Sequence, residues 1–506
     1  MNDPESSHEL YNAGHLFEAA AAHYQATGKT NLLNIALKEA DLLCQTFGPD
    51  TNQLHLWPGH EIVEMGLARL YRVTGNPRYL NLAKYFIDVR GTRPGGDDYH
   101  QSRIPPVDQT EAIGHAVRAG YLYSGMADIT ALTGDPQYVS AIDKIWENAV
   151  GKKLYLTGGI GSRVQGEAFG DNYELPNLTA YNETCAAVAN VFWNERLFLL
   201  HGDARYVDVL ERTLYNGLLS GVSLDGTKFF YSNPLESDGS HQRSPWFGCA
   251  CCPGNITRFL PSVPGYVYAQ AGDTIYVNLY AGNTASIKLE SGRTVIITQE
   301  TRYPWNGTVK MTVQPEWRRN KEFTIKVRIP GWARNEPGPG GLYQFSDALN
   351  EPVSLTVNGE NVPVKLDKGY VSLVRAWKPG DVIELDMPML IRHVTASENV
   401  PADRGRVALQ RGPIVFCAEW PDTPNGKVRK LLLPDDQPLT TRFAPALLNG
   451  VQVIEGKGFN VATNEFGKAF KRLQDFTAIP YFAWANRGPG EMIVWIANSE
   501  STVRAP

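Results

Sequence analysis

Three of the six cysteines in the chain lie within four consecutive positions, as Cys249, Cys251 and Cys252. Thiolates bind soft or borderline metal ions, and a metal ion or another nearby positive charge lowers the pKa of a thiol until the nucleophilic thiolate is present at neutral pH. With half of them in this short stretch, the six cysteines are too clustered to form a spread-out framework of disulfides. The cluster therefore predicts metal binding, nucleophilic chemistry or both.

A second short stretch offers a carboxylate at Glu183 and a thiol at Cys185. Together with Cys251 and Cys252, these two side chains would complete one tetrahedral zinc shell. We expect one of the sulfurs to act as a nucleophile as well, and the residue types leave open whether it is Cys251 or Cys252. A purely structural zinc knot is the alternative, but structural sites favour Cys and His, so the Glu ligand argues against it.

A glycine-rich segment at 156–169 contains a candidate general acid, Glu167. The segment matches neither a dinucleotide fingerprint nor a phosphate-binding loop, because no strand precedes it and no Gly-Lys-Ser/Thr follows. As a long loop before a buried helix, it is expected to overhang a pocket and to bring Glu167 to the reacting bond. The alternative is ordinary, since most glutamates in loops are solvated surface residues.

The elements that must position these residues are helical hairpins. A helix, a glycine turn and a second helix recur four times before residue 250, with the turns at Gly28, Gly75, Gly134 and Gly202. Each glycine stands where a left-handed residue would end a helix. We expect a toroid of helical hairpins of the (α/α)6 type. A closed ring of six hairpins needs more helices than these four supply, so we expect the N-terminal part of the barrel to be missing from this sequence.

The first helix of each hairpin is expected to begin at His15, His60, His115 or Glu183 and to continue in small and apolar residues. Small residues nearly all round indicate a buried inner helix. Because each copy occupies the same place in its hairpin, these four side chains should surround one pocket. A lone histidine is more often structural, but three at equivalent positions favour a binding site. Helix N-termini also direct backbone donors there, which suits hydroxyl-rich or anionic ligands.

The second half of the chain changes to the alternating pattern of strands from about Thr274. Turn residues such as Asn358-Gly359 separate the strands and predict an antiparallel β-sandwich. The fold class is therefore α+β with several domains. We expect a helical barrel at 1–265, incomplete at its N-terminus, a β-sandwich at 266–395, and a second sandwich or β-rich region at 396–506.

Composition excludes several classes of partner. The 506 residues carry a net charge of −5 without any block of like charges, so nucleic acid and anionic membranes are not expected to bind. No signal peptide is visible at Met1–Ser7 and no uncharged stretch is long enough to span a bilayer, which favours a cytoplasmic location. A homodimer is the oligomeric state considered.

Six motifs occurring in this order resemble the β-L-arabinofuranosidases of glycoside hydrolase family 127 and its close relative family 146. The similarity runs from about residue 8 to at least residue 415. The motifs are Gly14–Ala19, Gly59–Glu61, Gly114–Tyr123, Leu156–Ser162 with Gly166–Phe169, Glu183–Ala186 and Cys249–Asn255.

The resemblance implies an (α/α)6 barrel followed by β-sandwiches, a Zn²⁺ ion, and hydrolysis with retention of the anomeric configuration. It implies that Cys251 is the nucleophile and Glu167 the acid/base. The implied zinc ligands are Glu183, Cys185, Cys251 and Cys252. The implied residues of the sugar subsite are His15, His60 and His115.

The leading hypothesis is a zinc-dependent retaining glycosidase that releases L-arabinofuranose from β-linked plant oligosaccharides or glycopeptides through a thioglycosyl intermediate. One alternative is a non-catalytic sugar-binding or zinc-stabilised scaffold. Another is a sugar epimerase or isomerase on the same toroid, in which pairs of histidines would transfer protons. The cysteine cluster would have no part in that mechanism.

Overall fold

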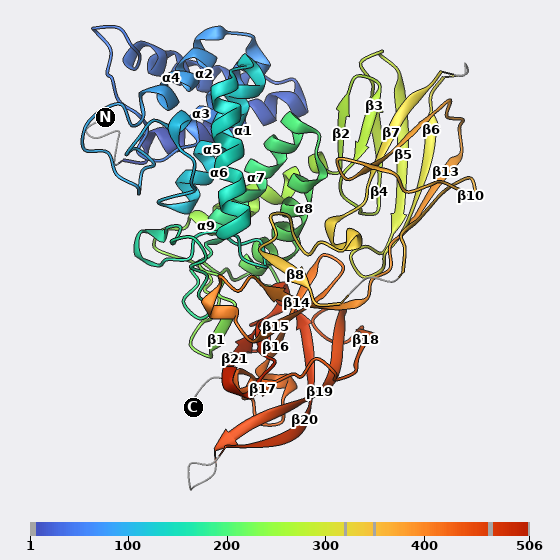
Figure 1. The fold of residues 1–506 in the computed structure, drawn as a ribbon. Helices are drawn as coiled ribbons and strands as arrows, with labels where there is room; N and C mark the ends of the chain where they lie inside the picture. Colours follow the sequence, from blue (N-terminus) through green and yellow to red (C-terminus); the bar gives the residue numbers. More distant parts are fainter. Residues whose placement is uncertain (1–6, 318–320, 348–350, 464–468, 504–506) are drawn as a thin grey trace. The chain divides into compact units, whose positions relative to one another are not determined.

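The computed structural model describes residues 7–317, 321–347, 351–463 and 469–503. Helices predominate in the first half of the chain and strands in the second half (Figure 1). The chain divides into two compact units. The first comprises Met1–Leu154, Ile160–Asn172 and Ala189–Leu200, and the second comprises Tyr155–Gly159, Tyr173–Val188 and His201–Pro506. Among the described residues, no helix is both long enough and apolar enough to cross a membrane.

The helical part of the chain consists of hairpins, as the glycine turns predicted. Gly28, Gly75 and Gly134 follow their helices with φ values of 69°, 71° and 71°, the left-handed conformation that ends a helix. Asn76 and Asp135 then cap the next helix with their side chains. The helices before residue 250 are α1 (Glu9–Thr27), α2 (Asn31–Thr46), α3 (Val63–Thr74), α4 (Pro77–Val89), α5 (Ala116–Thr133), α6 (Pro136–Lys152), α7 (Thr184–His201) and α8 (Ala204–Thr213).

The prediction that a helix begins at His15 is wrong, because α1 begins at Glu9 and His15 lies inside it. The neighbouring Gly14 has a packing role instead of starting the helix. A Cβ atom at Gly14 would lie 2.6 Å from the backbone nitrogen of Val63, at the start of α3, and one at Gly66 would lie 2.7 Å from the carbonyl oxygen of Gly14. The two glycines therefore let α1 and α3 pack closely. The other predicted helix starts agree more closely with the structure. His115 and Glu183 immediately precede α5 and α7, and His60 precedes α3 by three residues.

A β-sandwich follows the helices. One sheet has six strands in the order β10-β9-β13-β6-β5-β4 and the other has five in the order β11-β12-β7-β3-β2. Alternate residues of both sheets share one buried core. The strands are β2 (Tyr268–Ala271), β3 (Thr274–Val277), β4 (Asn283–Lys288), β5 (Thr294–Thr301), β6 (Thr308–Pro315), β7 (Phe323–Arg328), β9 (Ser354–Val357), β10 (Glu360–Asn361), β11 (Leu366–Asp367), β12 (Tyr370–Arg375) and β13 (Asp381–Asp386).

The prediction that this sandwich is antiparallel throughout needs one correction, because β3 and β7 pair in parallel. Between these strands the chain crosses to the other sheet to form β4, β5 and β6, and it returns beside β3 in the same direction. The predicted hairpin at Asn358-Gly359 is confirmed, with positive φ at both residues.

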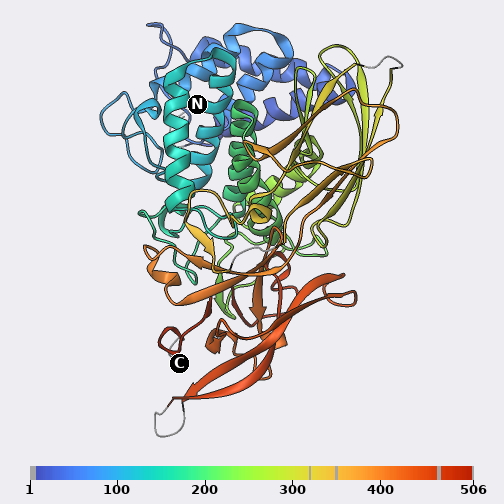
Figure 2. The same ribbon diagram turned by 45° about the vertical axis from the view of Figure 1, so that its right-hand side comes forward.

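The C-terminal region forms an 11-stranded sheet that also takes up β1 (Glu236–Asp238) and β8 (Tyr343–Phe345) at the two ends of its strand order. A long ribbon of β19 and β20 is its most extended feature (Figure 2). The remaining strands are β14 (Ile391–Ala396), β15 (Arg406–Arg411), β16 (Ile414–Glu419), β17 (Leu431–Leu432), β18 (Leu439–Ala444), β19 (Val451–Thr463), β20 (Ala469–Pro480), β21 (Glu491–Ile493) and β22 (Ile496–Ala497).

Candidate active site

The cysteine cluster lies at the start of a short helix, α9 (Cys251–Phe259). Cys251 and Cys252 are its first two residues, so both thiols stand at the positive end of the helix dipole. Cys252 is fully buried and Cys251 is partly buried, whereas Cys249 is exposed and lies outside the helix. The two cysteines within α9 are therefore at least partly buried, whereas Cys249, which precedes the helix, is exposed.

Glu183 and Cys185 come from the start of α7, which a neighbouring segment holds in place. The backbone N–H of Thr184 donates to the carbonyl oxygen of Tyr231, and its hydroxyl donates to that of Phe230. The side chain of Asn233 in turn donates to the carbonyl oxygen of Asn182. These hydrogen bonds fix the residues on either side of Glu183, so the direction of its carboxylate is set by the backbone.

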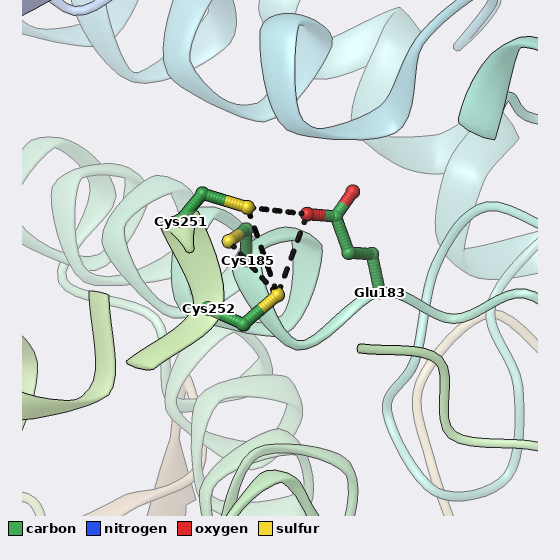
Figure 3. A group of neighbouring side chains, drawn as sticks. All are labelled: Glu183, Cys185, Cys251 and Cys252. Carbon is green, nitrogen blue, oxygen red and sulfur yellow. Dashed lines mark hydrogen bonds between the residues drawn. The ribbon is translucent and has the colours of Figure 1, made fainter. Parts of the chain in front are cut away.

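The four side chains meet in one cluster within the second unit (Figure 3). Sγ of Cys251 lies 3.3 Å from Oε1 of Glu183 and 3.7 Å from Sγ of Cys252. Sγ of Cys252 lies 3.6 Å from the same carboxylate oxygen and 3.3 Å from Sγ of Cys185. None of these cysteines is in a disulfide. The structure therefore brings together the four side chains that the sequence predicted as zinc ligands.

The donor set fits a zinc ion. Zn–S bonds of about 2.3 Å in a tetrahedron set two sulfurs roughly 3.8 Å apart, close to the separations in the cluster. Three sulfurs and one carboxylate oxygen also match the ligand types that zinc accepts. Two helix N-termini, those of α7 and α9, point their positive ends at these ligands and favour their anionic forms.

The thiols differ in their electrostatic surroundings. Hydrogen bonds from Cys185 and Cys252 lower the pKa of Cys251, against the opposing effect of its burial. Burial raises the pKa of Cys185 and Cys252 well above the ordinary value. The hydrogen bonds that Cys251 receives therefore favour its thiolate form.

Tyr231 is a member of the cluster that the sequence analysis missed. Its hydroxyl lies 3.2 Å from Sγ of Cys251. The residue sits in an irregular stretch without glycine or histidine signals, and its backbone pairs with Thr184 at the start of α7. No pattern in the sequence could have found it.

Within the first unit, Glu167 pairs with a predicted subsite histidine. Nε2 of His115 lies 2.9 Å from Oε2 of Glu167. Glu167 has a positive φ of 50°, and its loop is tied down by isolated backbone pairs that join Ala168 to both His115 and Arg163. The Glu167 side chain is 32% exposed, so a partly open carboxylate stands on a fixed loop.

The other two predicted histidines join the same group of rings. The ring of His60 lies 5.7 Å from that of His115, and Tyr11 bridges His60 and His15 with ring distances of 4.5 and 4.4 Å. Burial lowers the pKa of His60 well below its ordinary value, so this imidazole is neutral near pH 7. The three histidines are therefore neighbours, although His15 reaches the group from inside its helix.

Comparison with known proteins identifies the family of this chain. Sequence profiles of the β-L-arabinofuranosidase GH127 catalytic domain and middle domain match residues 2–265 and 274–389, and the family 127 C-terminal domain matches residues 391–497. The chain belongs to glycoside hydrolase family 127. The resemblance seen in the motifs is confirmed, and this family 127 chain is a glycosidase.

Individual relatives agree with the family assignment. A curated protein of Bifidobacterium longum subsp. longum, named as a non-reducing end β-L-arabinofuranosidase, is 37% identical, covering 97% of this chain and 79% of that protein. A solved structure of a GH127 β-arabinofuranosidase is 52% identical with a TM-score of 0.95, covering 99% of this chain and 78% of the other. A GH127 β-L-arabinofuranosidase from Geobacillus stearothermophilus T6 is 42% identical with a TM-score of 0.92, covering 98% and 81%. The predicted order, helices first and β-sheet domains after them, is likewise confirmed.

Proposed function

We propose that this family 127 enzyme hydrolyses β-L-arabinofuranosides, releases L-arabinofuranose with retention of the anomeric configuration, and uses zinc as its cofactor. The observation that carries the proposal is the Cys251 thiol, held within hydrogen-bonding distance of Glu183 and Tyr231 in a cluster of metal-ligand side chains. The name of the Bifidobacterium relative supports the substrate class and action at a non-reducing end. The natural substrate would be a plant-derived oligosaccharide or glycopeptide that contains arabinose.

Retaining glycosidases usually employ two carboxylates, one as nucleophile and one as acid/base. In this proposal the Cys251 thiolate takes the place of the nucleophilic carboxylate. Its sulfur attacks the anomeric carbon, the bond from that carbon to the leaving oxygen breaks, and Glu167 gives its proton to the leaving oxygen. A thioglycosyl intermediate on Cys251 results.

The second half of the reaction reverses these roles. Glu167, now a carboxylate, takes a proton from a water molecule whose oxygen attacks the anomeric carbon. The carbon–sulfur bond breaks and its electron pair returns to Cys251, which regenerates the thiolate and the protonated Glu167. Two inversions at one carbon give net retention.

Glu183, Cys185, Cys251 and Cys252 would hold the zinc ion. When bound, the ion favours the thiolate form of its cysteine ligands and makes sulfur a better leaving group. His15, His60 and His115 would bind the hydroxyl groups of the sugar. For the finer architecture, we propose an (α/α)6-type toroid within residues 1–265, a β-sandwich at 266–395 and a second β-rich domain at 396–506, supported by the helical hairpins and the family assignment. The last of these boundaries is adjusted by one strand, because β14 (Ile391–Ala396) pairs with β15 in the C-terminal sheet.

The test is release of 4-nitrophenol from 4-nitrophenyl β-L-arabinofuranoside by zinc-replete enzyme, with the α-anomer as the control substrate. We expect the β-anomer to be cleaved and NMR to show the β-sugar as the first product. Cys251→Ser should lower kcat/KM by a factor of about 100 or more, and Glu167→Gln should also lower it, by less on this good leaving group than on a poor one. Cys249→Ser, which changes an exposed thiol outside the cluster, is the matched control and should keep full activity. Absence of release by the wild-type enzyme, or full activity of Cys251→Ser, would overturn the proposal.

A further inference from the structure

The side chain of His115 caps the N-terminus of a helix, a role that histidine rarely has. It is the N-cap of α5, and its Nδ1 accepts the backbone N–H of Arg118 at 3.3 Å. Asn, Asp, Ser and Thr are the usual residues at this position. Because Nδ1 is an acceptor here, the proton of the neutral ring must be on Nε2.

The proton on Nε2 faces a carboxylate oxygen. Oε2 of Glu167 lies 2.9 Å from Nε2 of His115, so the imidazole donates to this oxygen. His60 has the opposite arrangement, because its Nδ1 lies 3.0 Å from the carbonyl oxygen of Glu61 and carries the proton there. The helix cap therefore makes His115, in contrast to its neighbour, a donor at Nε2.

Contacts with neighbouring residues hold both His115 and Glu167 in place. The backbone bridge from Ala168 to His115 ties the loop of Glu167 to the start of α5. The ring of Tyr99 lies 5.3 Å from that of His115, and its edge lies near Gly166 in the same loop. The side chain of His115 is buried. The orientation of the carboxylate is thus defined by the fold before any substrate binds.

We propose that His115 is a positioning residue that selects which oxygen of Glu167 transfers the proton. The proposal rests on the acid/base role proposed above for Glu167. With Oε2 accepting from His115, Oε1 carries the proton that passes to the leaving oxygen, and Oε1 later receives the proton from water. The same hydrogen bond stabilises the carboxylate that exists between the two steps. His115 would therefore act through Glu167, in addition to any contact with the sugar.

Two substitutions separate this role from helix capping. His115→Asn keeps a good N-cap but is too short to reach Glu167. His115→Gln offers an amide N–H that is long enough to donate to the carboxylate. The measurement is kcat/KM on a series of aryl β-L-arabinofuranosides that runs from 2,4-dinitrophenyl to phenyl, with thermal unfolding recorded for each variant. Poor leaving groups depend on acid catalysis and good ones do not.

We expect His115→Asn to fall about 10- to 100-fold on the phenyl glycoside and much less on the dinitrophenyl glycoside, since a hydrogen bond to a charged group has an effect of this size. His115→Gln should recover part of the loss. An equal loss on all leaving groups would show a role limited to sugar binding or stability, and no loss would show that the hydrogen bond is unimportant. Either result overturns the proposal. Glu167→Gln is measured in parallel: if it too lacks the leaving-group dependence, the acid/base assignment itself is wrong.

Discussion

The hydroxyl of Tyr231 lies 3.2 Å from Sγ of Cys251, while the carbonyl oxygen of Tyr231 accepts the backbone N–H of Thr184. One residue thus touches both helix starts that form the cluster, the start of α7 through its backbone and the start of α9 through its side chain. The position of the proposed nucleophile relative to Glu183 depends on this link.

Tyr231→Phe removes the hydroxyl and leaves the backbone link intact. When Cys251 is a thiolate, the O–H of Tyr231 donates to it, so we expect kcat/KM to fall about 10-fold or more. Metal content, measured by mass spectrometry, should not change, because the phenol oxygen is outside the ligand set. Tyr276→Phe in β3 is the control for loss of a tyrosine hydroxyl elsewhere. Unchanged kinetics in Tyr231→Phe would show that this hydrogen bond does not affect the thiol.

Loss of one buried sulfur should release the metal ion. We expect purified Cys185→Ser and Cys252→Ser to contain much less zinc than the wild type, whereas Cys249→Ser retains it. A chelator should also lower the melting temperature of the wild type, because an ion that binds only the folded state stabilises it. Full retention of zinc by Cys185→Ser would show that the ligand set is assigned wrongly.

The contact between α1 and α3 predicts a strong effect of a single methyl group. In Gly66→Ala the new Cβ would lie 2.7 Å from the carbonyl oxygen of Gly14, which is backbone and cannot rotate away. We expect a loss of about 1–3 kcal/mol in the free energy of unfolding, as for other overpacked cores. Gly254→Ala is the matched control, because Gly254 lies in α9 and the added Cβ would have no atom within 4 Å beyond its chain neighbours and the backbone of its own helix. Chemical denaturation curves of both variants measure the difference, and equal stability would contradict the packing argument.

Glu195 in α7 links stability to pH. Burial raises the pKa of Glu195 to about 8, although Arg196 opposes the shift. The folded state therefore binds a proton that the unfolded state has released, so the stabilising contribution is complete below about pH 4.5 and disappears as the pH rises through about 8. The melting temperature of the wild type should fall relative to that of Glu195→Gln between about pH 5 and pH 8.5. Glu147→Gln, at an exposed position of α6, is the control. Parallel melting curves for Glu195→Gln and the wild type would show that Glu195 is ionised at all these pH values.

Much of the architecture follows from local signals in the sequence. Gly28, Gly75 and Gly134 end helices because a left-handed residue is needed there, and that requirement is met by the residue type itself. The alternation of apolar residues likewise gave the strands of the sandwich. The error at His15 has the same origin: a glycine inside a helix looks like a boundary until the partner helix that needs the space is known.

The residues of the candidate site likewise fall into those that the sequence predicts and those that only the tertiary structure reveals. The residue types and motifs of the sequence were enough to predict a metal site of three sulfurs and one carboxylate, and the structure places these four side chains together. Only the tertiary structure decided that Tyr231 reaches Cys251 and that His115 donates to Glu167, because hydrogen bonds between residues 20 and 52 positions apart depend on how loops pair and leave no periodic trace in the chain.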